Sequence, residues 1–162
     1  MSASTNADLE APRPNPASPV GFTDVRLTDR DVILVREPLA NRFSNPQDGH
    51  YQAQFTAVSP VASFTFTRGW ASSDYVIALG RTVRIFNTHL ETSAAAPVQV
   101  QQGVEAAGII GSSPYPVVAL GDFNSAADGS TTPTYANLLG SGLRDVWGRR
   151  PAPYPRQDVL PG

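Results

Sequence analysis

Residues 83–124, VRIFNTHLETSAAAPVQVQQGVEAAGIIGSSPYPVVALGDFN, predict a β-α-β unit. The β-branched and aromatic run 83–88 is typical of a strand, and the apolar run 116–120, which stops at a glycine, is typical of a second, buried strand. Between them a proline precedes residues at helical spacing, which predicts a helix over 97–110 with an apolar stripe of Val100, Val104, Ala107 and Ile110. Because such crossovers leave their two strands parallel, both strands should end at the same edge of one sheet.

Three polar residues follow these two strands directly. His89 follows the first strand, while Asp122 and Asn124 follow the second, in the loop GDFNS. Taken singly, a histidine at a strand end and an Asp-x-Asn turn after glycine are ordinary loop chemistry. Taken together at the edge where α/β sheets build their sites, an imidazole, a carboxylate and an amide predict a functional site.

The rest of the chain alternates short apolar runs with turn signals, which predicts an α/β fold. Within 62–70, Phe64 and Phe66 alternate with threonines, so one face of that strand should be the more buried. We expect a loop over 37–50, further strands at 31–36, 51–58, 73–80 and 81–89, and a second helix over 133–139.

The first twenty residues hold four prolines among small and polar side chains. This composition favours extended or disordered backbone, so residues 1–20 are predicted to be a disordered arm preceding a domain over 21–162. Residues 148–162 return to proline and arginine without periodicity.

Composition excludes several classes of function. Cysteine is absent, which excludes disulfides, thiolate metal sites and cysteine nucleophiles. All 12 cationic residues are arginine, which excludes a Schiff-base or P-loop lysine. The formal net charge of −2 argues against a large basic face for nucleic acid, and no apolar run approaches the roughly 20 residues of a membrane span.

Several other residues have simpler interpretations than a place in a site. Arg68 and Arg84 are expected to be solvated on strand faces, although arginine there can also steer an anionic substrate. Glu91 is expected to be a solvent-facing loop carboxylate, with orientation of His89 as the alternative, and Trp70 is expected in the core.

Two of these segments resemble the paired motifs of a known family. The segments NTHLE at 87–91 and VVALGDFNS at 117–125 resemble those of the endonuclease/exonuclease/phosphatase superfamily of metal-dependent phosphoesterases. The residues TY at 134–135 and LRDVW at 143–147 resemble the segment that follows in this family. The resemblance implies a four-layer α/β sandwich with two mixed β-sheets flanked by helices.

The resemblance also implies roles for the three polar residues. His89 would hydrogen-bond a non-bridging phosphate oxygen, Asp122 would orient or deprotonate the attacking water, and Asn124 would hold the water or phosphate in line. Asp122 and Asn124 would bind Mg²⁺, Mn²⁺ or Ca²⁺ through oxygen. The substrates implied are nucleic acid, phospholipid headgroups or phosphoinositides.

The resemblance covers roughly residues 20–150 and lacks two elements of the family. No early strand brings the metal-binding glutamate, and the closing Asp-His pair is absent because the histidines are His50 and His89 alone. We therefore expect an incomplete domain, truncated at both ends, that hydrolyses phosphoesters far more slowly than an extended chain. An exposed sheet edge in such a domain predicts self-association. The sequence predicts no cellular location. Secretion would be compatible with it if an N-terminal signal were missing from the truncated domain.

Two alternatives to this function remain. A calcineurin-like metallophosphatase also uses glycine-aspartate loops with a nearby asparagine, but it requires an early Asp-x-His pair and later histidines, which this sequence lacks. In a non-catalytic β-rich binding module, His89 and Asp122 would only close loops. Metal-dependent thermal stabilisation would favour the phosphoesterase.

Overall fold

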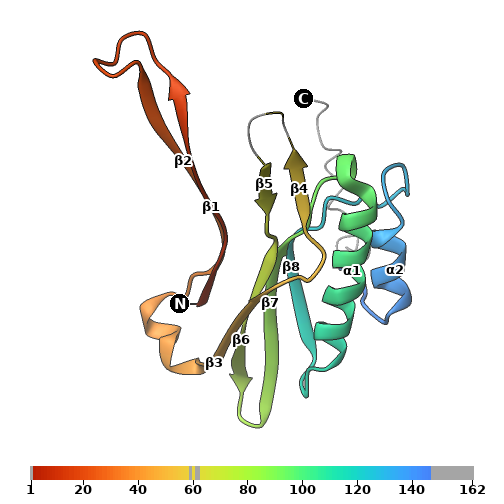
Figure 1. Cartoon of the computed structure of the whole chain (residues 1–162). Coiled ribbons are helices and arrows are strands. Elements are labelled where there is room, and N and C mark those ends of the chain that lie inside the picture. Colours follow the sequence, from red (N-terminus) through yellow and green to blue (C-terminus); the bar gives the residue numbers. More distant parts are fainter. Residues whose placement is uncertain (1, 59, 61–62, 147–162) are drawn as a thin grey trace, which may run out of the picture.

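A computed structural model describes residues 2–58, 60 and 63–146 and shows an α/β fold (Figure 1). Two short 3-10 helices accompany the strands and α-helices. In chain order the elements are β1 (Ser2–Pro14), β2 (Phe22–Ile33), η1 (Glu37–Arg42), β3 (Phe43–His50), β4 (Phe55–Val58), β5 (Ser63–Phe66), β6 (Gly69–Ala78), β7 (Arg81–His89), η2 (Ser93–Ala95), α1 (Ala96–Gly111), β8 (Val117–Asp122) and α2 (Thr134–Gly140).

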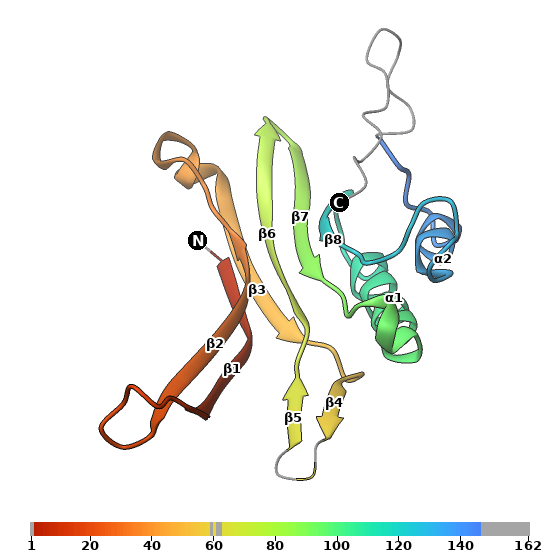
Figure 2. The same ribbon diagram turned by 90° about the horizontal axis from the view of Figure 1, so that it is seen from above.

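The main sheet has the strand order β3-β6-β7-β8 (Figure 2). β3, β6 and β7 pair antiparallel, and β8 pairs parallel to β7 through the α1 crossover. The β-α-β prediction is therefore confirmed, with both strands and the helix within one or two residues of their expected positions. Because β7 and β8 are parallel, their carboxyl ends lie side by side, where the site residues were expected.

The hydrophobic core lies between this sheet and the helices. Phe86 on β7 and Ile110 on α1 belong to a buried cluster that also includes Tyr51, Leu90 and Ala106. Trp70 stacks on Phe86 with a centroid separation of 5.7 Å, so its expected place in the core is confirmed. On β5, the expected alternation is also confirmed, since the phenylalanines at 64 and 66 are less exposed than their neighbours.

The predicted apolar stripe of α1 is confirmed at Ile110, which is buried, and is wrong at Val104. Val104 is 52% exposed. The residues of α1 that are buried are Gln99, Gln102, Gly103, Ala106 and Ile110. The physical reason is that the glutamine amides bond to loop backbone below the helix, which stabilises a polar stripe that periodicity of apolar residues cannot reveal.

The two glycines within α1 should respond oppositely to alanine. A Cβ on Gly103 would lie 2.5 Å from Thr134 Cγ2 on α2, whereas nothing lies within 4 Å of a Cβ on Gly108. Gly108→Ala should therefore raise the free energy of unfolding by about 0.5–1 kcal/mol through helix propensity. Gly103→Ala should lower it, because buried Thr134 must move. Urea unfolding of both variants checks this, and stabilisation by both would contradict the close approach of the two helices.

The N-terminal residues, whose composition favours extended or disordered backbone, form a two-stranded hairpin. β1 pairs antiparallel with β2 over the full length of both strands, from Ser2 opposite Ile33 to Pro14 opposite Phe22. The hairpin extends away from the helices in Figure 1. The fixed φ of proline is compatible with an edge strand. A proline-rich segment can therefore form a strand when a neighbouring strand supplies the hydrogen bonds.

The expected loop over 37–50 is also wrong, because it contains η1 and the edge strand β3. β3 carries mostly exposed polar side chains and has an irregular register opposite β6 between Ser44 and Gln47. An edge strand of this kind lacks the apolar alternation on which prediction depends.

The described residues form one mixed sheet and two antiparallel two-stranded sheets, β1-β2 and β4-β5. A second mixed sheet, which a complete four-layer sandwich requires, is not formed by residues 2–58, 60 and 63–146. Of the helices that the structure describes, none combines the length and apolar character needed to cross a membrane.

Candidate functional site

The candidate site lies where β7 and β8 end. His89 and Asp122 are register partners in the parallel pair, and His89 Nε2 lies 3.9 Å from Asp122 Oδ2. The Asp122 side chain is 66% exposed, so its carboxylate opens to solvent at the sheet edge. The structure thus brings together the two residues that the sequence placed at one edge.

Asn124 joins the two strand ends. Its backbone N–H donates to Asp122 Oδ1 at 2.9 Å, and its side-chain Nδ2 donates to the carbonyl oxygen of Leu90 at 2.9 Å. The residue adopts a left-handed φ of 47°, which asparagine tolerates better than most residues. All three predicted site residues therefore lie within one small region, with the Asp122 carboxylate oriented by the turn that follows it.

Arg68 and Glu91 belong to this region as well, contrary to expectation. Glu91 is buried, with a side chain only 7% exposed, and its two carboxylate oxygens accept from Arg68 at 3.4 Å. Arg68 Nη1 also donates to Asp29 Oδ2 at 2.8 Å and lies 3.1 Å from His89 Nδ1. The expected solvated positions were wrong because β6 starts beside the end of β7. The signal in the sequence that could have shown this is the short connection at Gly80, because a tight turn between two strands brings the start of the first beside the end of the second.

Two buried glutamines of α1 support the loops of the site. Gln102 Oε1 accepts from the backbone N–H of Glu91 at 2.7 Å. Gln99 Nε2 donates to the carbonyl oxygen of Phe123 at 2.7 Å, and Gln99 Oε1 accepts from the Thr134 hydroxyl at 2.7 Å. One helix thereby holds the loop after β7, the loop after β8 and the start of α2, which fixes the relative positions of the two strand ends.

A hydroxyl pair beneath the site anchors β7. Thr88 Oγ1 donates to the carbonyl oxygen of Gly69 at 2.7 Å and lies 2.8 Å from the hydroxyl of Tyr51. Since Thr88 donates its proton to Gly69, the Tyr51 hydroxyl is the donor in the second bond. Burial raises the pKa of Tyr51 well above its ordinary value, so it stays a neutral donor.

Asp74, which is buried, and Arg84, which is partly buried, form a separate ion pair on β6 and β7. Arg84 Nε donates to Asp74 Oδ1 at 2.8 Å, and Nη2 donates to Oδ2 at 3.1 Å. The hydrogen bond from Arg84 lowers the pKa of Asp74 below its usual value, and that from Asp74 raises the pKa of Arg84. The expected solvated position of Arg84 is wrong, since it pairs with the residue opposite in the register.

A hard cation at this site would have one exposed carboxylate, that of Asp122, as its ligand. Within residues 2–58, 60 and 63–146, no group of three or more His, Asp or Glu side chains is arranged to hold a metal ion. Asp122 supplies one exposed carboxylate, and the Asn124 side chain in the turn that follows is held by its Nδ2 bond to the Leu90 carbonyl oxygen. Mg²⁺ keeps several waters and binds through one or two carboxylates together with substrate phosphate, so this set meets its minimum requirement.

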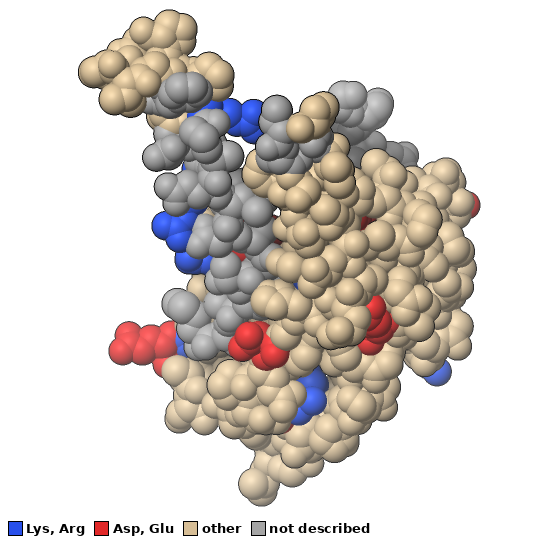
Figure 3. Space-filling model, viewed as in Figure 1, with Lys and Arg blue, Asp and Glu red and all other residues tan. Residues whose placement is uncertain are grey.

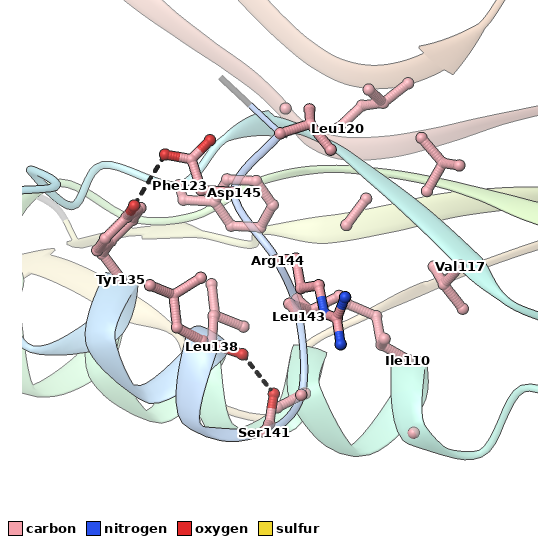
Figure 4. A pocket seen from close by; sticks show the side chains of 18 of the residues that line it. Ile110, Val117, Leu120, Phe123, Tyr135, Leu138, Ser141, Leu143, Arg144 and Asp145 are labelled. Carbon is pink, nitrogen blue, oxygen red and sulfur yellow. Dashed lines mark hydrogen bonds between the residues drawn. The ribbon is translucent and has the colours of Figure 1, made fainter. Parts of the chain in front are cut away.

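The structure has a groove of about 870 Å³ (Figure 4). Asp122 and Asn124 are among the residues that line it. It runs along β8 between α1 and α2, and its wall is mostly apolar, with Ile110, Leu138 and Leu143 among the lining residues. The segment after α2 is tied to that helix by a hydrogen bond from the Tyr135 hydroxyl to Asp145 at 2.8 Å. Trp147, the last residue of the LRDVW motif, lies outside the described residues.

Charged side chains of both signs are scattered over the face shown in Figure 3. Residues other than Lys, Arg, Asp and Glu, drawn in tan, separate them, in keeping with the small net charge of the chain. This face offers no broad basic surface among the described side chains drawn there.

Comparisons with known proteins add no family to this picture. No protein-family model matches the chain, and searches of curated proteins and of solved structures give no significant match. The motifs at 87–91 and 117–125, with the geometry described above, are therefore the basis for a functional proposal.

Proposed function

We propose that this chain carries a metal-dependent phosphoesterase site of the endonuclease/exonuclease/phosphatase kind, which hydrolyses a phosphodiester or phosphomonoester. The parallel register that places His89 opposite Asp122 is the observation that carries the proposal. It is supported by Asn124, whose backbone and side chain connect the two strand ends. A hydrogen-bond donor, a carboxylate and an amide held close together can assist the attack of water on phosphorus by orienting the water and stabilising the charge that develops.

Each residue has a distinct role in the proposed reaction. His89 donates a hydrogen bond to a non-bridging phosphate oxygen, whose negative charge grows in the transition state. Asp122, oriented by its bond from the Asn124 N–H, accepts a proton from the attacking water or aligns it. The Asn124 amide holds the water or the phosphate in line.

Asp122 and Asn124 are also the residues that would hold the cation. When bound, Mg²⁺ or a similar ion neutralises charge on the phosphoryl oxygens. The chain's own contribution is to keep the Asp122 carboxylate exposed and fixed in direction, because the Asn124 N–H occupies its other oxygen.

The proposal includes the four-layer sandwich. Val117 and Ala119 of β8 pack against the core, so the alternating Val118 and Leu120 lie on the opposite face of the sheet. Both are about half exposed. Apolar side chains on a second sheet face support a further layer packed against that face.

Isosteric substitutions test the function. Asp122→Asn and His89→Gln should each lower the rate of bis-p-nitrophenyl phosphate hydrolysis with Mg²⁺ by about 100-fold, because each removes a general base or a transition-state donor. Asp128→Asn, which makes the same charge change in an exposed loop, should leave the rate within about twofold. The rates are measured over long incubations at high protein concentration, since slow turnover is expected.

A binding measurement accompanies the rates. Mg²⁺ with inorganic phosphate should raise the Tm of the wild-type chain but not that of Asp122→Asn. If hydrolysis and the Tm shift were both the same in wild type and Asp122→Asn, the phosphoesterase would be rejected. The non-catalytic module, in which these residues only close loops, would then be the better description.

A further inference from the structure

We propose that Arg68 is a positioning residue that holds His89 in the tautomer with its proton on Nε2. Arg68 Nη1 lies 3.1 Å from His89 Nδ1, which is hydrogen-bond distance. A guanidinium group can only donate, and it does not lose its proton in proteins. The Nδ1 atom must therefore accept, and in a neutral imidazole the single ring proton is then on Nε2.

The position of Arg68 is itself fixed by two carboxylates. Its side chain is 13% exposed, Nη1 donates to Asp29 Oδ2 at 2.8 Å, and Nε and Nη2 each lie 3.4 Å from a Glu91 oxygen. Asp29 comes from β2 and Glu91 from the loop after β7, so the guanidinium is held from two sides. Its direction toward His89 is therefore a property of the packed structure.

The opposite ring nitrogen lies on the side of the exposed Asp122 carboxylate. His89 Nε2 lies 3.9 Å from Asp122 Oδ2, which is too far for a direct hydrogen bond. The Nε2–H group consequently points toward a space bordered by the Asp122 carboxylate and is available to a ligand there. Asp122 accepts protons in this arrangement, and His89 donates.

The Nε2–H tautomer adds a detail to the proposed function. The part of the inference in which Nε2–H donates to a phosphate oxygen rests on that function. The Nε2–H tautomer presents a donor to a phosphate oxygen, whereas the other tautomer would present a lone pair and repel it. Arg68 acts through His89 and does not itself touch the phosphate. The tautomer itself follows from the hydrogen bond to Arg68 and is independent of any reaction.

NMR of the histidine ring nitrogens tests the proposal. The chain has two histidines, and His50→Gln assigns their signals. Long-range proton-nitrogen correlation spectra are recorded over a pH series, and the tautomer is assigned from the signals of the neutral ring. His89 should show an unprotonated Nδ1 and a protonated Nε2. A protonated Nδ1 in the wild-type chain would overturn the proposal without any variant.

Substitution of Arg68 supplies the second measurement. Arg68→Met should shift both His89 ring nitrogens toward the averaged values of a tautomer mixture, while Arg68→Lys, which keeps charge and donors, should retain the wild-type shifts. Arg81→Met, at an exposed arginine on β7, is the control and should move neither signal. Identical His89 shifts in wild type and Arg68→Met would refute the role of Arg68.

The hydrolysis assay separates this proposal from the function. A chain with the Nε2–H tautomer, dependent on Arg68, but with no hydrolysis would support the positioning role and count against the phosphoesterase. The opposite result is a wild-type chain that has a protonated His89 Nδ1 and hydrolyses the substrate, with hydrolysis lost in Asp122→Asn. That result would support the phosphoesterase and reject the positioning role of Arg68.

Discussion

Replacing Gly121 with alanine is expected to lower the free energy of unfolding by at least about 3 kcal/mol. Gly121 has a φ of 129°, and a Cβ there would overlap the carbonyl oxygen of Thr88, with the Thr88 carbonyl carbon at 2.9 Å. β7 cannot move aside easily, because the Thr88 hydroxyl is bonded to Tyr51 and Gly69. The substitution should therefore separate the ends of β7 and β8. Urea unfolding measures the resulting loss of unfolding free energy.

Gly129→Ala is the matched control for backbone strain. Gly129 also has a positive φ, of 78°, but nothing lies within 4 Å of a Cβ at this position. Gly129→Ala should lower the free energy of unfolding by about 1–2 kcal/mol, which is the cost of a left-handed conformation alone. Equal losses in the two variants would show that the approach of Thr88 is not what requires glycine at 121.

Removal of the Asp74 carboxylate should cost about 3–5 kcal/mol, the usual effect of breaking one partner of a buried ion pair. The Asp74 side chain is 7% exposed and accepts two hydrogen bonds from Arg84 and one from Asn45 at 2.9 Å. Asp74→Ala leaves the Arg84 guanidinium buried without its partner. Asp48→Ala, on the exposed side of neighbouring β3, should change the free energy by no more than about 0.5 kcal/mol.

The contribution of Asp74 should disappear in acid. The hydrogen bond from Arg84 lowers the pKa of Asp74 in the folded state, so the folded protein binds fewer protons than the unfolded chain. This stability is fully present above the unfolded carboxyl pKa of about 3.9 and is lost as pH falls through the lower folded value. The difference in unfolding free energy between wild type and Asp74→Ala should therefore shrink below pH about 4. A constant difference down to pH 3 would contradict the pairing.

The β-α-β unit could be predicted because its signals are local. An apolar run, a proline-started helix and a run ending at Gly121 each lie within one element, and the rules for crossovers then place His89 near Asp122. The edge elements could not be predicted in this way. β1 and β3 owe their strand conformation to pairing with β2 and β6, and their own residues are polar or proline-rich.

The α/β class, the two parallel strand ends and the three polar residues that follow them could be predicted from periodicity and spacing along the chain. The burial of particular charged and amide side chains could not, because it depends on the packed fold. Arg68, Glu91, Gln99 and Gln102 are residue types that usually lie at the surface. The last three are buried and Arg68 is partly buried, because distant carboxylates, loop carbonyls and N–H groups satisfy them. A buried polar group depends on its partners, and those partners are brought together only by the packed fold.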